Sequence, residues 1–146
     1  MLDIDKSIAK VLGSYSLAVH AKDVGALVRL YDPKVRVFDA WGVWSYDGLD
    51  AWQRAVEAWF ASLHNERVKV TFEDVQTSGT TECAVVSAIA IYASLSSEGV
   101  ELRSMQHRMT WGLRTTGHVL RIIHEHTSSP VGFEDMKAIL VRERKT

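Results

Sequence analysis

Ile122-Ile123-His124-Glu125-His126 is a segment with the two-residue period of a β-strand, and it carries polar side chains in an apolar setting. Successive side chains on a strand point to opposite faces of a sheet, so His124 and His126 are predicted to share a face with Ile122. Glu125 is then predicted to face the other way. Because a polar group on the apolar face of a sheet needs a partner, the two histidines indicate a cavity.

Two other segments repeat this pattern, with His107, Met109 and Trp111 in one and Val35, Val37 and Asp39 in the other. If all three segments are strands of one sheet, the same face gathers an aspartate and three histidines. The sequence therefore predicts a polar cluster inside a hollow on one side of the sheet.

The first half of the chain has the apolar spacing of helices, and the second half has that of strands. Helices are expected near residues 4–19, 24–31 and 49–63, with Asp23 capping the second and Pro33 ending it. Strands joined by tight turns are expected near residues 68–73, 83–95, 100–114 and 119–127. Helices followed by an antiparallel meander indicate the α+β class, with three N-terminal helices packed on the concave face of a curved sheet.

Apolar residues are also predicted on the outer, convex face of that sheet. Val85, Ile89 and Ile91 would lie there, and an exposed apolar sheet face usually marks a subunit interface. We therefore expect a homodimer formed through the sheet face, or a larger ring. An apolar tail is expected to pack across the partner subunit, through Phe133, Met136, Ile139 and Leu140.

The composition suits a single globular domain over residues 1–146, because 47% of the residues are hydrophobic. A net charge of -1 and the lack of a basic cluster outside residues 142–145 argue against a nucleic-acid partner. The longest apolar run is far too short to span a membrane. No signal pattern precedes the first helix, and the lone Cys83 excludes an internal disulfide, so we expect a cytoplasmic protein.

Two longer segments resemble a known family. Leu30-Tyr31-Asp32-Pro33, followed by Val37-Phe38-Asp39 and Tyr46-Asp47-Gly48, resembles the start of SnoaL-like, or ketosteroid-isomerase-like, proteins of the nuclear transport factor two-like superfamily. The ending from Gly117 to Pro130 resembles SnoaL-like proteins and kinase association domains. The resemblance implies a cone-shaped α+β barrel with a mainly antiparallel sheet.

The resemblance also implies roles for individual residues. Asp39 falls where ketosteroid isomerases keep their general base, and Tyr15 falls where they keep a tyrosine that donates to the developing enolate oxygen. Met109 falls at the second oxyanion donor, which a thioether cannot replace. His124 and His126 replace lining residues of that family. These departures from the family pattern argue against steroid isomerisation and leave open a proton transfer on another substrate.

Each candidate has a structural alternative. Asp39 can be a turn aspartate bonded to the backbone, and Tyr15 can be a core tyrosine. His107, His124 and His126 can bind a ligand, hold a metal, or bond to buried polar groups, and no spacing here is a strong metal signature. We expect no metal and no cofactor. The expected cavity wall consists of Trp41, Trp44, Trp59, Phe60, Tyr92, His107, Met109, Trp111 and Ile122.

Two functional hypotheses follow. In the first, the protein binds a hydrophobic small molecule with a carbonyl or carboxylate group and acts as an isomerase, cyclase or dehydratase. Asp39 removes a proton, Tyr15 stabilises the oxyanion, and His124 or His126 shuttles the proton. In the second, the chain is a non-catalytic ligand-binding or oligomerisation domain, as in kinase association domains.

Overall fold

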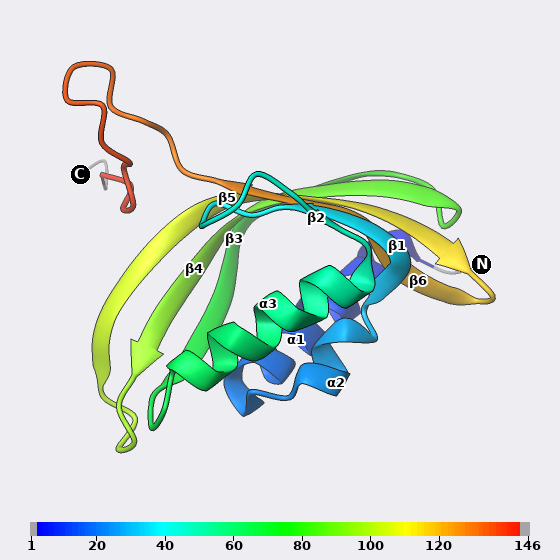
Figure 1. The fold of residues 1–146 in the computed structure, drawn as a ribbon. Helices are drawn as coiled ribbons and strands as arrows, with labels where there is room; N and C mark the ends of the chain where they lie inside the picture. Colours follow the sequence, from blue (N-terminus) through cyan, green and yellow to red (C-terminus); the bar gives the residue numbers. More distant parts are fainter. Residues whose placement is uncertain (1–2, 144–146) are drawn as a thin grey trace.

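A computed structural model describes residues 3–143 and shows three helices against the concave face of a curved sheet (Figure 1). This arrangement confirms the predicted α+β class and the expected side of the sheet. The elements are α1 (Ile4–Ala21), α2 (Val24–Val28), β1 (Tyr31–Phe38), β2 (Tyr46–Asp47), α3 (Leu49–Ser62), β3 (Arg67–Gly79), β4 (Cys83–Leu95), β5 (Glu101–Thr116) and β6 (Val119–Ser128).

The helices form where amphipathic stretches meet capping residues. Asp3 caps α1 by accepting a hydrogen bond from the Asp5 backbone N–H at 3.0 Å. Asp23 caps α2 in the same way through Ala26, as predicted from the sequence. The apolar face of α1 packs on the sheet through Ile8, Val11, Leu12, Tyr15, Ala18 and Val19, all buried.

The sheet has six strands in the order β2-β1-β6-β5-β4-β3. Every pairing is antiparallel except that of β1 with β6, which is parallel. The second helix is shorter than predicted, because β1 begins at Tyr31 and includes Pro33. A register shift between Tyr31 and Arg36 accommodates Pro33, whose missing N–H would disrupt a regular ladder.

A β-bulge on β6 overturns one prediction. Gly112 pairs with His124 while Leu113 pairs with Ile122, so Ile123 is an extra residue without a partner on β5. The bulge reverses the side-chain alternation beyond it. Ile122 remains on the concave side, but His124 and His126 lie on the outer face, and Glu125 and Thr127 are buried on the inner side.

The other two predicted alternations are confirmed. His107, Met109 and Trp111 are buried on the inner face of β5, as Val35 and Val37 are on β1. The core lies between this face and the helices, and its largest fully buried side chains include Trp111, Tyr31, Ile8, Leu27 and Met109. The sheet thus brings two of the three predicted polar segments under the helices.

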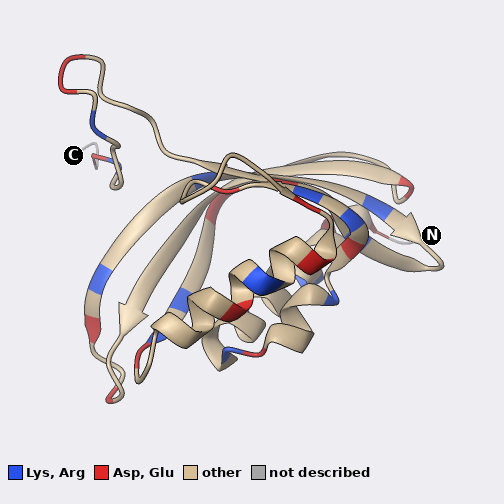
Figure 2. Ribbon diagram, in the orientation of Figure 1, with Lys and Arg blue, Asp and Glu red and all other residues tan. Residues whose placement is uncertain are grey.

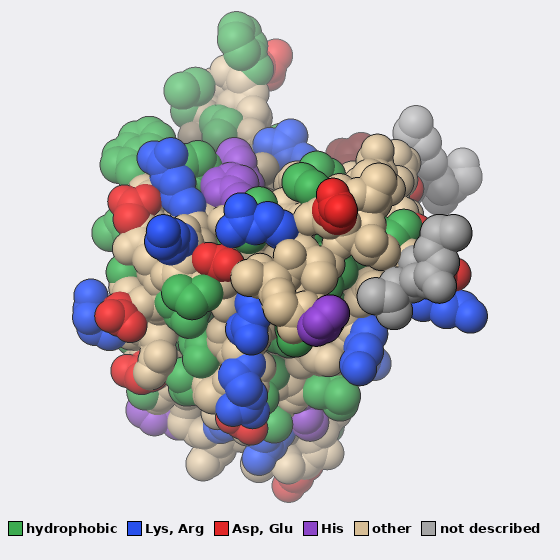
Figure 3. Space-filling model, turned by 90° about the vertical axis from the view of Figure 1, so that its right-hand side faces the viewer, with side chains coloured by type: hydrophobic (Ala, Val, Ile, Leu, Met, Phe, Trp, Pro, Cys, Tyr) green, Lys and Arg blue, Asp and Glu red, His purple; other side chains and the backbone are tan. Residues whose placement is uncertain are grey.

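The last described residues form an arm that leaves the end of β6 and projects from the body (Figure 1). A backbone bridge between Val131 and Ala138 closes it into a hook. Phe133 is 96% exposed and Met136 is 76% exposed. In Figure 3 hydrophobic side chains (green) lie on the segment that rises above the body. The arm therefore exposes Phe133 and Met136, while its end is held to β5 by a hydrogen bond from the Gln106 backbone N–H to the Leu140 carbonyl oxygen at 2.7 Å.

Charged residues are scattered over the ribbon, and Figure 2 shows acidic and basic positions interspersed on helices and strands alike. Within residues 3–143, no helix combines the length and the hydropathy that crossing a membrane requires.

Gly79 is required by the turn between β3 and β4. Its φ is +120°, and a Cβ there would clash with the Cys83 carbonyl oxygen. Gly79→Ala is expected to lower the free energy of unfolding by about 3 kcal/mol, because a backbone clash adds to dihedral strain. Gly99→Ala is the control, since its φ is +82° and nothing lies within 4 Å. Chemical denaturation measures both, and equal losses would contradict the assignment.

Candidate functional site

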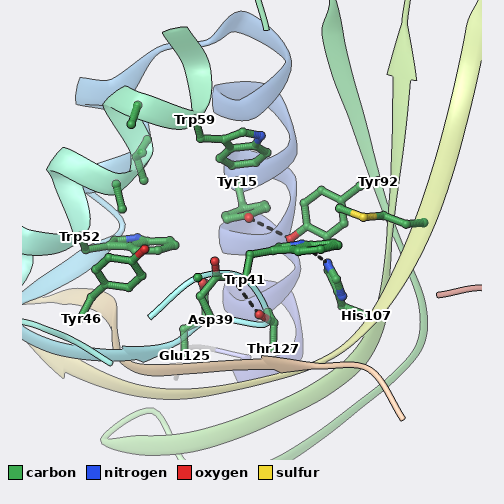
Figure 4. Close-up of a pocket in the computed structure, with 15 residues that line it drawn as sticks. Tyr15, Asp39, Trp41, Tyr46, Trp52, Trp59, Tyr92, His107, Glu125 and Thr127 are labelled. Atoms are coloured by element: carbon green, nitrogen blue, oxygen red, sulfur yellow. Dashed lines mark hydrogen bonds between the residues drawn. The ribbon is translucent and has the colours of Figure 1, made fainter. Parts of the chain in front are cut away.

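A cavity of about 520 Å³ lies between the helices and the inner face of the sheet (Figure 4). Its volume falls within the range of about 300–1,000 Å³ that is usual for small-molecule sites. Helices α1 and α3 supply one wall, and strands β4, β5 and β6 supply the other. Six aromatic side chains line it: Tyr15, Trp41, Tyr46, Trp52, Trp59 and Tyr92.

Two tyrosine hydroxyls meet across the cavity. The hydroxyl oxygens of Tyr15 and Tyr92 are 2.9 Å apart, and either can donate (Figure 4). Burial raises the pKa of Tyr15 well above its usual value, and burial is also the main cause that raises the pKa of Tyr92. Both groups stay protonated, so one O–H can donate within the pair while the other is available to a ligand.

Glu125 holds a carboxyl group in the wall of the cavity. Its Oε1 accepts hydrogen bonds from the Tyr31 hydroxyl at 2.6 Å and from the Trp111 indole N–H at 2.8 Å. Burial raises the pKa of Glu125 to about 7; the negative charge of Asp39 adds to this rise, and the two hydrogen bonds oppose it. At neutral pH this carboxyl is therefore able to give or take a proton.

Asp39 lies just beyond the end of β1 and is the second carboxyl of the cavity. Its Oδ1 accepts from the Thr127 hydroxyl at 3.1 Å, and the Thr127 oxygen in turn accepts from the Ala40 backbone N–H at 2.9 Å. Burial raises the pKa of Asp39, although hydrogen bonds from Thr127 and from the backbone of Trp41 and Ala40 oppose the shift. The side chain is thus both a cavity carboxylate and a turn residue.

His107 is held in one neutral form. The Trp41 indole N–H can only donate, so His107 Nε2, at 3.2 Å, must accept, and the proton sits on Nδ1. Nδ1 is 3.1 Å from the Ser129 hydroxyl, which donates onward to the Gln106 carbonyl. Burial lowers the pKa of His107, which favours the same neutral state.

The Trp52 indole N–H is buried in the cavity wall without a hydrogen-bond partner among the residues described. A buried N–H without an acceptor is costly, and a ligand oxygen can satisfy one.

The structure brings only part of the predicted site together. Asp39, Tyr15, Trp41, Trp59, Tyr92 and His107 all line the cavity. Phe60, Met109, Trp111 and Ile122 pack in the core beside it, and Trp111 contacts the site through Glu125. Trp44 is 96% exposed and lies outside.

The prediction that His124 and His126 enter the cavity is wrong. Because the bulge at Ile123 turns them outward, their rings flank Phe38 on the outer face, with centroids at 5.1 Å and 5.5 Å from its ring. His124 Nδ1 lies 2.7 Å from the Arg36 carbonyl oxygen. His107 is on the opposite face, and within residues 3–143 no group of three or more potential ligands could hold a metal ion.

Sequence reasoning missed Glu125, Tyr46, Trp52, Met105 and Thr127 as lining residues. A glycine inside a strand often marks a bulge, and Gly112 stands at the register shift opposite His124. Gly112 was therefore the available signal that the alternation of β6 would reverse.

A second hollow of about 720 Å³ lies outside the cavity, between residues 40–45 and the base of the C-terminal arm. It shares Asp39, Trp41, Gly42, His107 and Thr127 with the inner cavity. Trp41 is half exposed and lines both spaces. The hydrogen bond from its indole to His107 therefore fixes the boundary between them.

A curved sheet folded around an aromatic cavity places the chain in a known class. The SnoaL-like domain family matches residues 8–132, and the chain belongs to this family. The resemblance stated from the sequence is thereby confirmed. No curated protein matches the chain.

Solved structures with the same fold share little sequence with it. An NTF2-like protein of unknown function from Pseudomonas putida KT2440 is 19% identical with a TM-score of 0.82, over 99% of this chain and 100% of that chain. The protein Aln2 from a Streptomyces species is 13% identical, with a TM-score of 0.78 over 86% and 89% of the two chains. A proposed calcium/calmodulin dependent protein kinase II association domain from Xanthomonas campestris is 14% identical, with a TM-score of 0.71 over 83% and 84%. These likenesses establish the fold.

Glu125→Gln is expected to change how stability depends on pH. The folded chain keeps the Glu125 proton up to about pH 7, whereas the unfolded chain loses it near pH 4.5. The free energy of unfolding of the unsubstituted protein therefore falls as the pH rises between these values. At 1.36 kcal/mol per pH unit this loss is roughly 3 kcal/mol. The glutamine variant should lack it. Denaturation at pH 4 to 8 measures the difference.

The matched control is Glu98→Gln, at an exposed turn between β4 and β5. It should follow the native pH profile. An unchanged profile in Glu125→Gln would show that the buried carboxyl does not titrate in this range.

Proposed function

We propose that the cavity binds a hydrophobic carbonyl compound and moves a proton on it without a cofactor, as an isomerase, cyclase or dehydratase does. The SnoaL-like fold suggests a ligand-binding or isomerase-type domain. The observation that supports catalysis is the presence of a carboxylate, a titrating carboxyl and a neutral hydroxyl pair in one aromatic cavity. The cytoplasmic location expected from the sequence belongs to the same proposal.

Asp39 is the proposed general base. Burial raises the pKa of its carboxyl, which makes it a stronger base than an exposed aspartate. The Tyr15–Tyr92 pair donates a hydrogen bond to the carbonyl oxygen, where negative charge develops. Glu125 takes the shuttling role first expected of the histidines, because it is the cavity group that titrates near pH 7.

The charges of the residues that line the cavity restrict the chemical class of the ligand. Among the described residues that line the cavity, none is Lys or Arg, and two are acidic. A carboxylate ligand would meet like charge without a compensating cation, which is costly in a buried site. We therefore retain the carbonyl compound of the first hypothesis and drop the carboxylate.

Asp39→Asn tests the proposed base. Incubation with small aryl ketones in D₂O, followed by proton NMR, measures exchange of the hydrogens next to the carbonyl. Native protein should accelerate exchange of at least one ketone, and Asp39→Asn should slow it by about 10²–10⁴-fold, which is the usual contribution of a general base.

His124→Gln is the control for this experiment, because its ring lies on the outer face. It should keep the native exchange rate. Exchange that survives in Asp39→Asn but fails in His124→Gln would overturn both the base assignment and the geometry of the site.

A second candidate function is supported by a different observation. We propose that the chain forms a homodimer in which apolar surface of the outer sheet and of the C-terminal arm is covered. Phe133 and Met136 are largely exposed on a hooked arm, and Val85 is exposed on the outer face of β4. A non-catalytic association domain would need this surface and not the carboxyl groups.

Phe133→Asp combined with Met136→Asp is expected to convert a native dimer into monomers, because two charges would be buried at the interface. Sedimentation velocity measures the mass. Leu17→Asp is the control, since Leu17 is 74% exposed on α1, away from the arm. A native protein that is monomeric at micromolar concentration would rule out this candidate.

A further inference from the structure

We infer that the ligand of this cavity is an apolar organic cation, with its protonated or quaternary nitrogen held between Asp39, Glu125 and the surrounding aromatic rings. The inference rests on the proposed function only in that the cavity binds a small molecule. The inference adds that the ligand carries a positive charge, which neither the fold nor the family match implies.

The first step is the charge of the cavity. The side-chain hydrogen bonds to both carboxyl groups come from neutral donors. Asp39 accepts one from Thr127, and Glu125 accepts one each from Tyr31 and Trp111. No lysine or arginine within residues 3–143 lines this space. A buried carboxylate without an opposite charge is unfavourable, so a positive nitrogen is the complement that the wall lacks.

The second step is the arrangement of the rings. Tyr46 and Trp52 pack with centroids 5.4 Å apart at 56°, and Trp59 and Tyr92 pack at 6.2 Å and 63°. Figure 4 shows these pairs on different sides of a shared space, with Asp39 between them. Ring faces attract a cation, most strongly where water is excluded, and such cages bind ammonium groups.

The third step concerns the proposed chemistry. Removing a proton next to a carbonyl leaves negative charge on the ligand, beside two acidic side chains. Met109 packs in the core beside the cavity, and no lysine or arginine among the described lining residues can balance this charge. A cationic nitrogen in the ligand would supply the missing positive charge. The unpartnered Trp52 N–H can meet the oxygen of the same ligand.

The fourth step is a linkage to pH. A bound cation favours the ionised form of Glu125, so binding should release a proton and tighten as pH rises through about 7. The other titratable groups that face this region are Tyr15 from α1, Tyr31 from β1, Asp39 beyond β1, Tyr46 from β2, Tyr92 from β4 and His107 from β5. Burial keeps Tyr15, Tyr31 and Tyr92 protonated and His107 neutral, which leaves Glu125 as the group whose pKa lies near 7.

The test compares phenyltrimethylammonium with its neutral isostere tert-butylbenzene, and with benzoate as an aromatic anion. Tryptophan fluorescence follows binding, because Trp41, Trp52 and Trp59 line the cavity. At pH 8 the cation should bind at least about tenfold more tightly than its neutral isostere, as expected for a desolvated cation–π site with a carboxylate. Calorimetry in two buffers of different ionisation enthalpy should detect the released proton.

Asp39→Asn and Glu125→Gln should each reduce the preference for the cation, and Glu125→Gln should also abolish proton release. Asp47→Asn is the control, because it removes an exposed negative charge that pairs with Arg36 outside the cavity. Equal affinity for the cation and the neutral probe would overturn the inference. A cation preference that persists in both cavity variants would overturn its assignment to these carboxyls.

The ketone exchange experiment separates this inference from the proposed function. If neutral ketones exchange in an Asp39-dependent way and the cation shows no preference, the inference fails and the proposed function stands. If no probe binds and no ketone exchanges, both fail.

Discussion

The bulge at Ile123 is the constraint on which the site depends. One unpaired residue on β6 turns Glu125 under the helices, where Tyr31 and Trp111 both donate to the same carboxylate oxygen. A regular strand would instead bury two imidazoles and expose the carboxyl. The acidic character of the cavity therefore follows from a backbone irregularity, held in place by the strand pairs on either side of it.

Burial then determines the protonation state of each group. It keeps Tyr15 and Tyr92 protonated, holds His107 neutral and brings Glu125 close to titration at neutral pH. The residues come from separate parts of the chain and share a low-dielectric space, so each modifies its neighbours. The proposed proton transfer and the proposed preference for a cationic ligand both depend on these two carboxyl groups.

Trp41 and the C-terminal arm connect the cavity to the outside. The indole of Trp41 is fixed by His107 between the inner cavity and the outer hollow. Val131, Ala138 and Leu140 from the arm line that outer hollow. In the proposed homodimer, a partner subunit packed on the arm would therefore change the approach to the cavity.

Periodicity along the sequence determined the fold class, the helices on the concave face and the inner positions of Asp39, His107 and Tyr15, because burial of apolar stripes depends on local spacing. It did not determine the shorter α2, the strand through Pro33, or the orientation of His124, Glu125 and His126. Those features depend on how strands pair, and one extra residue reverses every side chain beyond it. The contents of the cavity were therefore decided by pairing between distant segments, which local spacing does not encode.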